Sequence, residues 1–296
     1  MKLSYISEKF SKQLVKEGEF DNLGLLSHTV GKLLVCYYDS SYLNELTKNK
    51  QISCIITTKE FATNFSTSNF GILVCENPLE LFYEIHHYLI AQTNFYKTDF
   101  DTIIASSAYI HPNAFVSVKN VVIGENTLIE PNVTIHENTY IGDNVIIRSG
   151  TVISGEGFEH KKFQGRWVAV KHAGGVQIQN DVEIQSNCAI SKSVFKTNTV
   201  IGENTKLDNL VHVAHNVTIG KSCRLAANAM IAGSVSIGDH VWIGPNAAVS
   251  SEIIIEENAQ ITIGAVVTRN VLKNQKVSGN FAIEHSKFLS FLKNIR

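Results

Sequence analysis

The sequence has few cysteines, few prolines and almost no net charge, and each shortage excludes a class of protein. The five cysteines are widely spaced and form no Cys-X-X-Cys motif, so neither a disulfide framework nor a zinc site is predicted. Only 4 prolines among 296 residues argue against a collagen-like or disordered chain. Lysine and arginine total 26 against 27 acidic residues, so no excess of positive charge favours a nucleic-acid partner.

Long apolar runs are also missing. No run approaches the length of a membrane span, and residues 1–17 lack the apolar stretch of a signal peptide. Unpaired cysteine usage is typical of a reducing compartment. We therefore expect a cytoplasmic protein with no membrane span, whose 296 residues can form about two domains of roughly 150 residues each.

A strict six-residue period occupies the second half of the chain. Every sixth residue is Ile, Leu or Val from Ile201 to Val267, and the same step links Ile123 to Ile153 and Ile178 to Ile190. This period fits a short strand plus a corner, three of which close a triangular coil with the aliphatic side chains inside. The prediction is a parallel β-helix.

Asparagine recurs at the same step. It stands at Asn126, Asn132, Asn138 and Asn144. Asparagine tolerates a left-handed backbone better than a branched residue does, and a tight corner needs that conformation. We therefore assign these asparagines a structural role at the corners.

Two breaks interrupt the period. Residues 154–175 are too polar and too rich in glycine to continue the wall, and we expect a protruding loop, a position that often carries function. The step from Ile190 to Ile201 spans eleven residues, which two repeats with one deletion explain if Phe195 takes the inward position.

The two flanks follow other patterns and complete the division of the chain. Apolar runs alternate with helix-like segments before residue 95, at 33–38, 42–50, 52–57, 70–75 and 78–92. This alternation predicts a small α/β domain over 1–95, followed by the β-helix over 96–278. Residues 279–296 form a predicted short helix whose apolar face should pack on a coil or on a neighbouring chain.

His215 is the histidine that the repeat singles out. Because Val213 takes the inward position, His215 should lie at a corner or on the outer face, where a solvated or capped role is the commoner one for a lone histidine. Three repeats make an 18-residue coil, so Gly233 stacks directly above His215, about 4.8 Å along the ladder. Acyl transfer needs a base beside an approachable N–H, because the base takes a proton while the N–H holds the oxyanion.

The segments around these two residues resemble the hexapeptide-repeat acyltransferases, and most closely the UDP-3-O-acylglucosamine N-acyltransferases. The similar stretches are His-Val-Ala-His-Asn-Val-Thr-Ile-Gly over 212–220 and Leu-Ala-Ala-Asn-Ala-Met-Ile-Ala-Gly-Ser over 225–234. Further similarity lies at 33–43, 55–58, 71–79 and in the pairs Gly157-Phe158 and Arg166-Trp167. The resemblance covers almost the whole chain and implies a left-handed coil, a homotrimer and a uridine-binding N-terminal domain.

The resemblance also implies roles for individual residues. His215 is the general base and Gly233 the oxyanion donor. Tyr42 is an aromatic that stacks on uracil, and Phe158 and Trp167 belong to a loop beside the nucleotide. We also assign Asn216 and Asn228, from the two similar stretches, to substrate binding.

Several positions depart from that family. Ser191-Lys192-Ser193 stands where the family has Asp-Arg-Gly, Glu252 stands where it has a second active-site histidine, and Cys36 stands where it has a second uracil-stacking aromatic. The long C-terminal extension associated with docking of acyl carrier protein is mostly absent. Asp208 or a carboxylate of another subunit is a candidate to orient His215.

The sequence therefore predicts an N-acyltransferase for a nucleotide-linked amino sugar in cell-surface glycan biosynthesis. The acyl donor is acyl-CoA or an acyl carrier protein thioester, with no permanently bound cofactor. No metal is predicted, because His160 and His172 bracket the loop without a metal-ligand spacing. Three alternatives stay open: the lipid A enzyme that acylates UDP-3-O-(3-hydroxyacyl)glucosamine, a sugar O-acyltransferase in which His212 is the next candidate base, and a non-catalytic β-helix scaffold.

Overall fold

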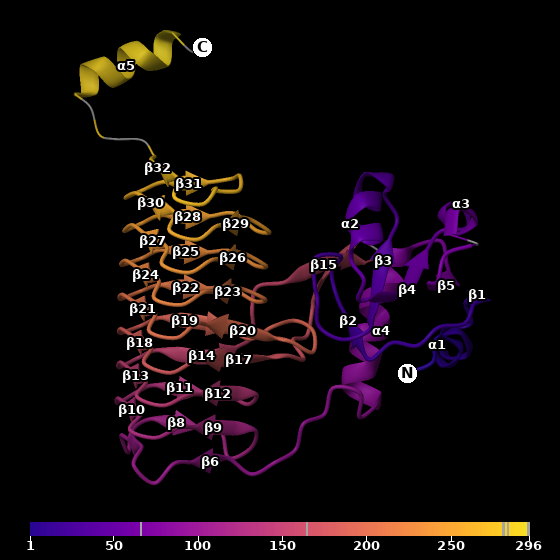
Figure 1. Ribbon diagram of the computed structural model, residues 1–296, viewed down its shortest axis with the longest axis horizontal. Coiled ribbons are helices and arrows are strands. Elements are labelled where there is room, and N and C mark those ends of the chain that lie inside the picture. The colour runs from indigo at the N-terminus through magenta and orange to yellow at the C-terminus, as the bar shows by residue number, and fades with distance from the viewer. Residues whose placement is uncertain (66, 164, 280–281, 283, 295–296) are drawn as a thin grey trace.

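The repeated aliphatic residues form the interior of a three-sided coil, and a separate five-stranded sheet lies beside it (Figure 1). The computed structural model describes residues 1–65, 67–163, 165–279, 282 and 284–294. All predicted inward positions from Ile123 to Val267 are buried. The chain is mainly β, and its coil is a left-handed parallel β-helix.

The N-terminal sheet is mostly parallel and carries helices on both faces. Its strands lie in the order β1 (Gln13–Lys16), β5 (Gly71–Val74), β4 (Ile52–Thr57), β3 (Leu33–Tyr37) and β2 (Asn22–Leu23), and only β1 runs antiparallel to its neighbour. The helices are α1 (Leu3–Phe10), η1 (Ser40–Tyr42), α2 (Leu43–Lys48), α3 (Lys59–Ala62), η2 (Thr63–Phe65) and α4 (Pro78–Gln92).

Two apolar cores hold this sheet between its helices. Leu34 and Ile56 pack on the side of α4, whereas Val35 and Ile55 pack on the side of α2 and α3. Because both faces are covered, the strands read as continuous apolar runs rather than as an alternating pattern. Pro78 occupies the start of α4, where its fixed φ is already helical and its missing N–H costs nothing.

Three parallel sheets form the three faces of the coil. The first face consists of β6 (Ile103–Ile104), β9 (Val121–Ile123), β12 (Thr139–Ile141), β17 (Gly175–Ile178), β20 (Asn198–Ile201), β23 (Thr218–Ile219), β26 (Ser236–Ile237) and β29 (Ile254–Ile255). The second face consists of β8 (Phe115–Val116), β11 (Thr134–Ile135), β14 (Val152–Gly155), β19 (Ala189–Ser191), β22 (His212–Val213), β25 (Met230–Ile231), β28 (Ala248–Val249) and β31 (Val266–Val267). The third face consists of β7 (Tyr109–Ile110), β10 (Leu128–Ile129), β13 (Ile146–Ile147), β18 (Glu183–Ile184), β21 (Lys206–Leu207), β24 (Arg224–Leu225), β27 (Trp242–Ile243), β30 (Gln260–Ile261) and β32 (Lys276–Val277).

The corners between faces have the left-handed backbone that the asparagine pattern predicts. Asn126, Asn132, Asn138 and Asn144 have φ values of 55°, 61°, 60° and 55°. Asn126 also donates a hydrogen bond to the Asn144 side chain one coil further on, at 3.3 Å. Their structural role is confirmed, because each places an asparagine where a branched residue would be strained.

The first break in the period is a β-hairpin that leaves the coil. Strands β15 (His160–Phe163) and β16 (Arg166–Ala169) pair antiparallel. In Figure 1 the hairpin extends from the coil toward the N-terminal sheet. The expectation of a protruding loop is confirmed.

The second break holds the N-terminal unit against the coil, and the expected inward position of Phe195 is wrong. The Phe195 side chain is buried outside the coil, with ring centroids 5.5 Å from Phe82, 6.5 Å from Tyr83 and 4.9 Å from His86. It belongs to the apolar core on the α4 side of the N-terminal sheet. Burying the ring among these aromatics favours the outward bulge over a regular coil.

The C-terminal helix α5 (His285–Asn294) stands beyond the last coil (Figure 1). Its Phe288, Leu289 and Phe291 side chains are exposed, so within the described residues the apolar face packs on no coil of the same chain. Phe281 and Ile295, which belong to the predicted apolar face, lie outside the described residues. Along the described parts of the chain, no helix is both long and apolar enough to cross a membrane.

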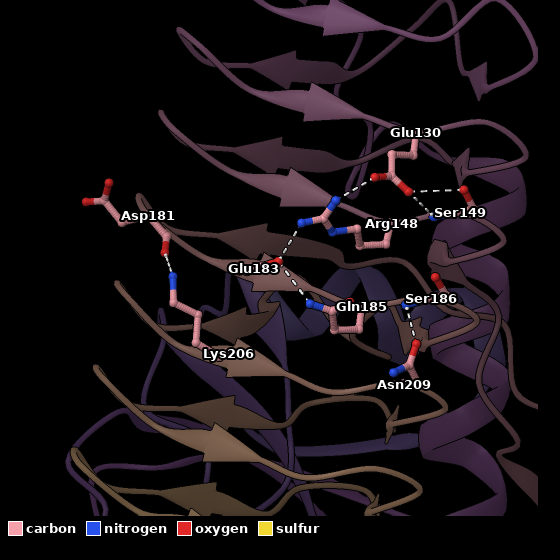
Figure 2. A network of polar contacts seen from close by, with 9 residues as sticks. All are labelled: Glu130, Arg148, Ser149, Asp181, Glu183, Gln185, Ser186, Lys206 and Asn209. Carbon is pink, nitrogen blue, oxygen red and sulfur yellow. Dashed lines mark hydrogen bonds and ion pairs between the residues drawn. The ribbon is translucent and has the colours of Figure 1, made fainter.

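A ladder of charged side chains joins successive coils on the third face (Figure 2). Arg148 donates from Nη1 to Glu130 at 2.7 Å and from Nη2 to Glu183 at 2.9 Å. Glu130 belongs to the coil before Arg148, and Glu183 follows the inserted hairpin. The two hydrogen bonds therefore connect the coils on either side of the insertion, and the Arg148 guanidinium holds the pKa of Glu130 below its ordinary value.

The depressed pKa of Glu130 gives a pH-dependent stability prediction. Its contribution is present above the pKa of an unfolded glutamate, about 4.3, and is lost as pH falls through the folded value. Arg148→Met should lower the free energy of unfolding by about 1 kcal/mol at pH 7, with the difference shrinking at pH 3.5. Urea unfolding followed by circular dichroism measures both values.

Arg224→Met provides the control for this experiment. Arg224 lies on the same face and stacks over the Trp242 ring at 5.1 Å. A carboxylate does not take part in that contact, so its loss should not depend on pH in this range. An Arg148→Met difference equal at both pH values would contradict the role of the Glu130 carboxylate.

Candidate functional site

His215 lies at the corner between the second and first faces, just after β22. Its side chain is only 13% exposed, although Val213 rather than His215 takes the inward position. The next residue, Asn216, has a φ of 58° and turns the chain. The imidazole therefore lies outside the aliphatic core but is covered by neighbouring segments.

Gly233 stacks on His215, as the 18-residue coil predicts. A Cβ atom added to Gly233 would lie 2.5 Å from Cε1 of His215 and 3.1 Å from its Nδ1. No real Cβ contact is so short, so any other residue here would displace the ring. The backbone also connects the two coils, because the Ser234 N–H donates to the His215 carbonyl at 3.0 Å.

The Gly233 N–H donates no hydrogen bond to another described residue. The N–H groups of Glu203, Lys221 and Ala227 occupy the same repeat position and donate to side chains of Gln179, Asp239 and Asp208 at 3.0, 2.7 and 3.1 Å. The N–H groups of Gly233, Asp239 and Glu257, at the same repeat position, have no such acceptor in the part of the chain that the structure describes, and only that of Gly233 lies against the His215 ring. An unpaired backbone N–H beside a histidine is a ready donor for an oxyanion.

The hairpin brings a carboxylate to His215. Glu159, directly before β15, places Oε2 3.3 Å from Nε2 of His215, while its Oε1 lies 2.7 Å from Nζ of Lys161. Burial raises the pKa of Glu159, but the contacts with His215 and Lys161 outweigh burial and hold it at about 2. The carboxylate is therefore ionised at neutral pH.

A second pair of the same kind lies beside the first. His172, fully buried, has Nδ1 3.0 Å from Oε2 of Glu156, and Lys192 contacts the other oxygen of Glu156 at 2.9 Å. Burial raises the pKa of Glu156, yet His172 and Lys192 hold it at about 2. The His172 and His215 rings meet edge to face with centroids 5.4 Å apart.

Gly157 allows the base of the hairpin to pass over both histidines. A Cβ added there would lie 2.7 Å from Nε2 of His172 and 3.1 Å from Cδ2 of His215. Glycine at position 157 therefore follows from the close approach of the backbone to the two rings.

A cleft of about 1230 Å³ separates the N-terminal sheet from the first face of the coil. The Tyr42 side chain, 49% exposed, lines it from η1. Asn216 and Glu252 line it from the corner that carries His215. Lys161 reaches it from the hairpin, so the cleft contacts all three parts of the chain.

The cleft lining does not include every predicted site residue, and His215 and Gly233 themselves lie beside it rather than in it. Asn216 lines it, but the Asn216 Oδ1 accepts from the Ser193 hydroxyl at 2.5 Å and from the Val194 N–H at 2.8 Å. Phe158 and Trp167 are 90% and 71% exposed on the hairpin and do not line the cleft. Asn228 lies at a different corner, where it donates to Asn246 at 2.6 Å.

The other candidates also have defined places. Asp208 accepts hydrogen bonds from the N–H groups of Asn209 and Ala227 rather than contacting His215. His212 lies outward on β22, where burial first and the nearby His215 second lower its pKa. Within the described residues, no group of three His, Cys, Asp or Glu side chains could hold a metal ion.

Sequence reasoning missed Glu159, Glu156 and the pairing role of His172. These residues lie in or beside the insertion, where the six-residue period gives no positions. The one signal was compositional, because the loop carries two glutamates and two histidines close together. That pattern indicates polarity without indicating which pairs form.

Comparisons with known proteins agree on one family. The family model described as bacterial transferase hexapeptide (six repeats) matches residues 120–155 and 198–233. UDP-3-O-acylglucosamine N-acyltransferase 2 of Nitrobacter winogradskyi is 36% identical, covering 73% of this chain and 69% of that relative. UDP-3-O-acylglucosamine N-acyltransferase of Acinetobacter baumannii is 46% identical over 67 residues, which are 23% of this chain and 18% of the relative.

A solved structure shares the fold. The UDP-N-acetylglucosamine acyltransferase from Campylobacter jejuni matches with a TM-score of 0.50 and 19% identity, covering 66% of this chain and 81% of that chain. The resemblance seen in the sequence is thus confirmed. The protein is an acyltransferase, and the chain belongs to the hexapeptide-repeat family that includes the UDP-3-O-acylglucosamine N-acyltransferases.

Proposed function

We propose that this protein transfers an acyl group from a thioester to the amine of a nucleotide-linked amino sugar. The observation that carries the proposal is the pairing of His215 with the unbonded N–H of Gly233. This pair lies at the corner whose Asn216 and Glu252 line the cleft. A base and an oxyanion donor side by side are the two groups that acyl transfer requires.

The reaction follows from these groups. The amine nitrogen attacks the thioester carbonyl, and His215 accepts the proton that the nitrogen loses. The Gly233 N–H donates to the carbonyl oxygen while it carries negative charge. The intermediate then expels the thiolate, which receives the proton from His215, and the amide product remains.

The contacts of His215 indicate which nitrogen acts as the base. A carboxylate 3.3 Å from Nε2 stabilises a proton on that nitrogen, so the lone pair is on Nδ1. Nδ1 is buried and has no hydrogen-bond partner among the described residues.

The cleft supplies the binding part of the proposal. Tyr42 offers an exposed ring at its edge, which suits stacking on uracil. Binding the nucleotide there places the sugar amine near His215. The translational and rotational entropy of the amine is then lost when the nucleotide binds, rather than during the acyl-transfer step. Cys36 also lines the cleft, at the position where the family carries a second aromatic.

The relatives favour one acceptor among the alternatives. Their names specify UDP-3-O-acylglucosamine and N-acyl transfer, so we propose a 3-O-acylated UDP-glucosamine of lipid A biosynthesis as the acceptor that fits best. The donor is an acyl carrier protein or CoA thioester, and no permanent cofactor takes part. The hairpin and the N-terminal sheet argue against an inert scaffold, because a stable coil needs neither.

A homotrimer in the cytoplasm completes the proposal. The outward row of the second face contains Thr134 and His212, but it also contains the apolar Phe115, Met230 and Val266, which are 56%, 40% and 73% exposed. Exposed apolar rows of this kind mark contact surfaces. Phe158 and Trp167, which do not line the cleft of their own chain, are then available to a neighbouring subunit.

Replacing His215 tests the base. His215→Ala should lower the rate of acyl transfer by about 10²- to 10⁴-fold. Thiol release from an acyl thioester, measured with UDP-linked amino sugars, gives that rate. Folding should survive, because the side chain lies outside the aliphatic core and its removal leaves no core cavity.

Light scattering is the control for this variant, and it should give three times the chain mass for wild type and variant alike. A monomer at micromolar concentration would remove the trimer from the proposal. A trimeric His215→Ala protein that transfers acyl groups at the wild-type rate would mean that the base lies elsewhere, with His212 the next candidate.

Replacing Gly233 tests the close approach. Gly233→Ala keeps the N–H but pushes the His215 ring away, because the added Cβ would lie 2.5 Å from Cε1. The rate should fall by about 10²-fold or more. In a His215→Ala background the same change should cost little, and additive losses in the double variant would show that Gly233 acts independently of the ring.

Replacing Tyr42 tests nucleotide binding. Tyr42→Ala should weaken binding of the sugar nucleotide by about 1–3 kcal/mol, the value of one stacked base, and leave thioester binding unchanged. Isothermal titration calorimetry with each ligand measures both. Tyr109→Ala is the control, because it removes a comparably exposed ring from the first coils. Equal losses for both ligands in Tyr42→Ala would contradict the uracil role.

A further inference from the structure

We propose that Glu159 couples nucleotide binding to the base, because it bridges Lys161 in the cleft and His215 at the corner. The ligand groups that Lys161 would take are the phosphates of the sugar nucleotide. The inference rests on the proposed function for the identity of that ligand. It adds a phosphate-binding residue and a positioning carboxylate, neither of which follows from the six-residue repeat.

The geometry gives one carboxylate two partners. Glu159 places Oε1 2.7 Å from Nζ of Lys161 and Oε2 3.3 Å from Nε2 of His215. The side chains of Lys161, Glu159 and His215 are only 32%, 20% and 13% exposed. At this degree of burial, charges interact more strongly than at an open surface.

Lys161 is placed to meet an anion. It lines the cleft and its Nζ lies 5.4 Å from the centroid of the Tyr83 ring. Lys196 is the second lysine of the cleft lining, which also contains Glu45 and Glu252. A phosphate group near Lys161 would compete with Glu159 for the ammonium, because both are anionic partners of the same donor.

Competition for Lys161 changes the net charge that acts on the His215 imidazole. In the empty cleft, the Lys161 charge offsets much of the Glu159 charge. Once phosphate occupies Lys161, the carboxylate acts on the imidazole alone and stabilises the imidazolium that forms as the amine loses its proton. The base is then strongest when the acceptor is bound.

Other titratable groups surround Glu159 and His215, and they are the same residues in the wild-type protein and in the variants proposed below. His28, His172 and His212 lie near His215, and Tyr83 lies near Glu159. His172 is paired with Glu156 and, through it, with Lys192. Glu156 therefore serves the second histidine, and Glu159 is the carboxylate in contact with the base.

Two variants should move the pH dependence in different ways. Glu159→Gln should shift the ascending limb of both kcat and kcat/KM to lower pH, by about one unit, because it removes the opposite charge. Lys161→Met should raise KM for the nucleotide sugar and shift the limb of kcat/KM to higher pH. It should leave the limb of kcat nearly unchanged, because phosphate already engages Lys161 in the wild-type complex.

Lys162→Met is the matched control. Lys162 is the next residue of β15, is exposed and does not line the cleft. This variant should keep wild-type KM and both pH limbs. Coincident limbs in wild type, Glu159→Gln and Lys161→Met would overturn the coupling, even if all three enzymes were active.

A titration without turnover separates the coupling from the proposed function. The His215 ring-proton resonance of the full chain is followed by NMR against pH, with and without inorganic pyrophosphate. Pyrophosphate should move the titration midpoint upward in wild type and in Lys162→Met, and by clearly less in Lys161→Met and Glu159→Gln. Equal movement in all four proteins would overturn the coupling, whereas absence of turnover with every amino sugar would overturn only the proposed function.

Discussion

The register of the coil is the constraint on which the rest of the structure depends. Aliphatic side chains repeat every six residues, and three repeats bring each strand into parallel register with the strand one coil below, as for Val213 and Ile231. The same register stacks corners on corners. It therefore fixes Gly233 above His215 without any contact dedicated to that purpose, and the close approach then requires glycine.

The two interruptions of this register provide contacts that a regular coil does not make, one to the N-terminal sheet and one to the two histidines. The bulge around Phe195 fastens the N-terminal sheet to the coil, and the hairpin carries Glu159 and Glu156 to the two histidines. Asn216 connects these features, because the residue beside His215 also holds Ser193 and Val194 of the bulge. A face of a regular coil offers no deep pocket by itself. The cleft therefore exists only where the hairpin, the bulge and the N-terminal sheet meet the coil.

The sequence predicted the parts of the molecule that obey a local rule. Periodicity located the aliphatic core, asparagine located the corners, and coil arithmetic placed Gly233 on His215. Phe195 was misplaced because counting repeats assumes that an apolar residue points inward, whereas a better-packed aromatic partner lay on α4. Glu159 could not be found because the hairpin conformation depends on tertiary contacts, and the sequence indicated Asp208 or a carboxylate of another subunit instead. The pairs Gly157-Phe158 and Arg166-Trp167 resemble a family loop that lies beside the nucleotide, yet the Phe158 and Trp167 side chains are exposed in this chain.

A direct test compares two acceptors that differ in one non-hydrogen atom, the nitrogen or oxygen that attacks the thioester. Thiol release and product mass are recorded with an acyl thioester and either a UDP-linked 2-amino sugar or the same compound bearing a hydroxyl at that carbon. If His215 and Gly233 serve amine acylation beside a nucleotide cleft, release occurs with the amino sugar and yields an amide that resists hydroxylamine. Release only with the hydroxyl compound, or at the same rate without any acceptor, would contradict amine acylation by His215 and Gly233.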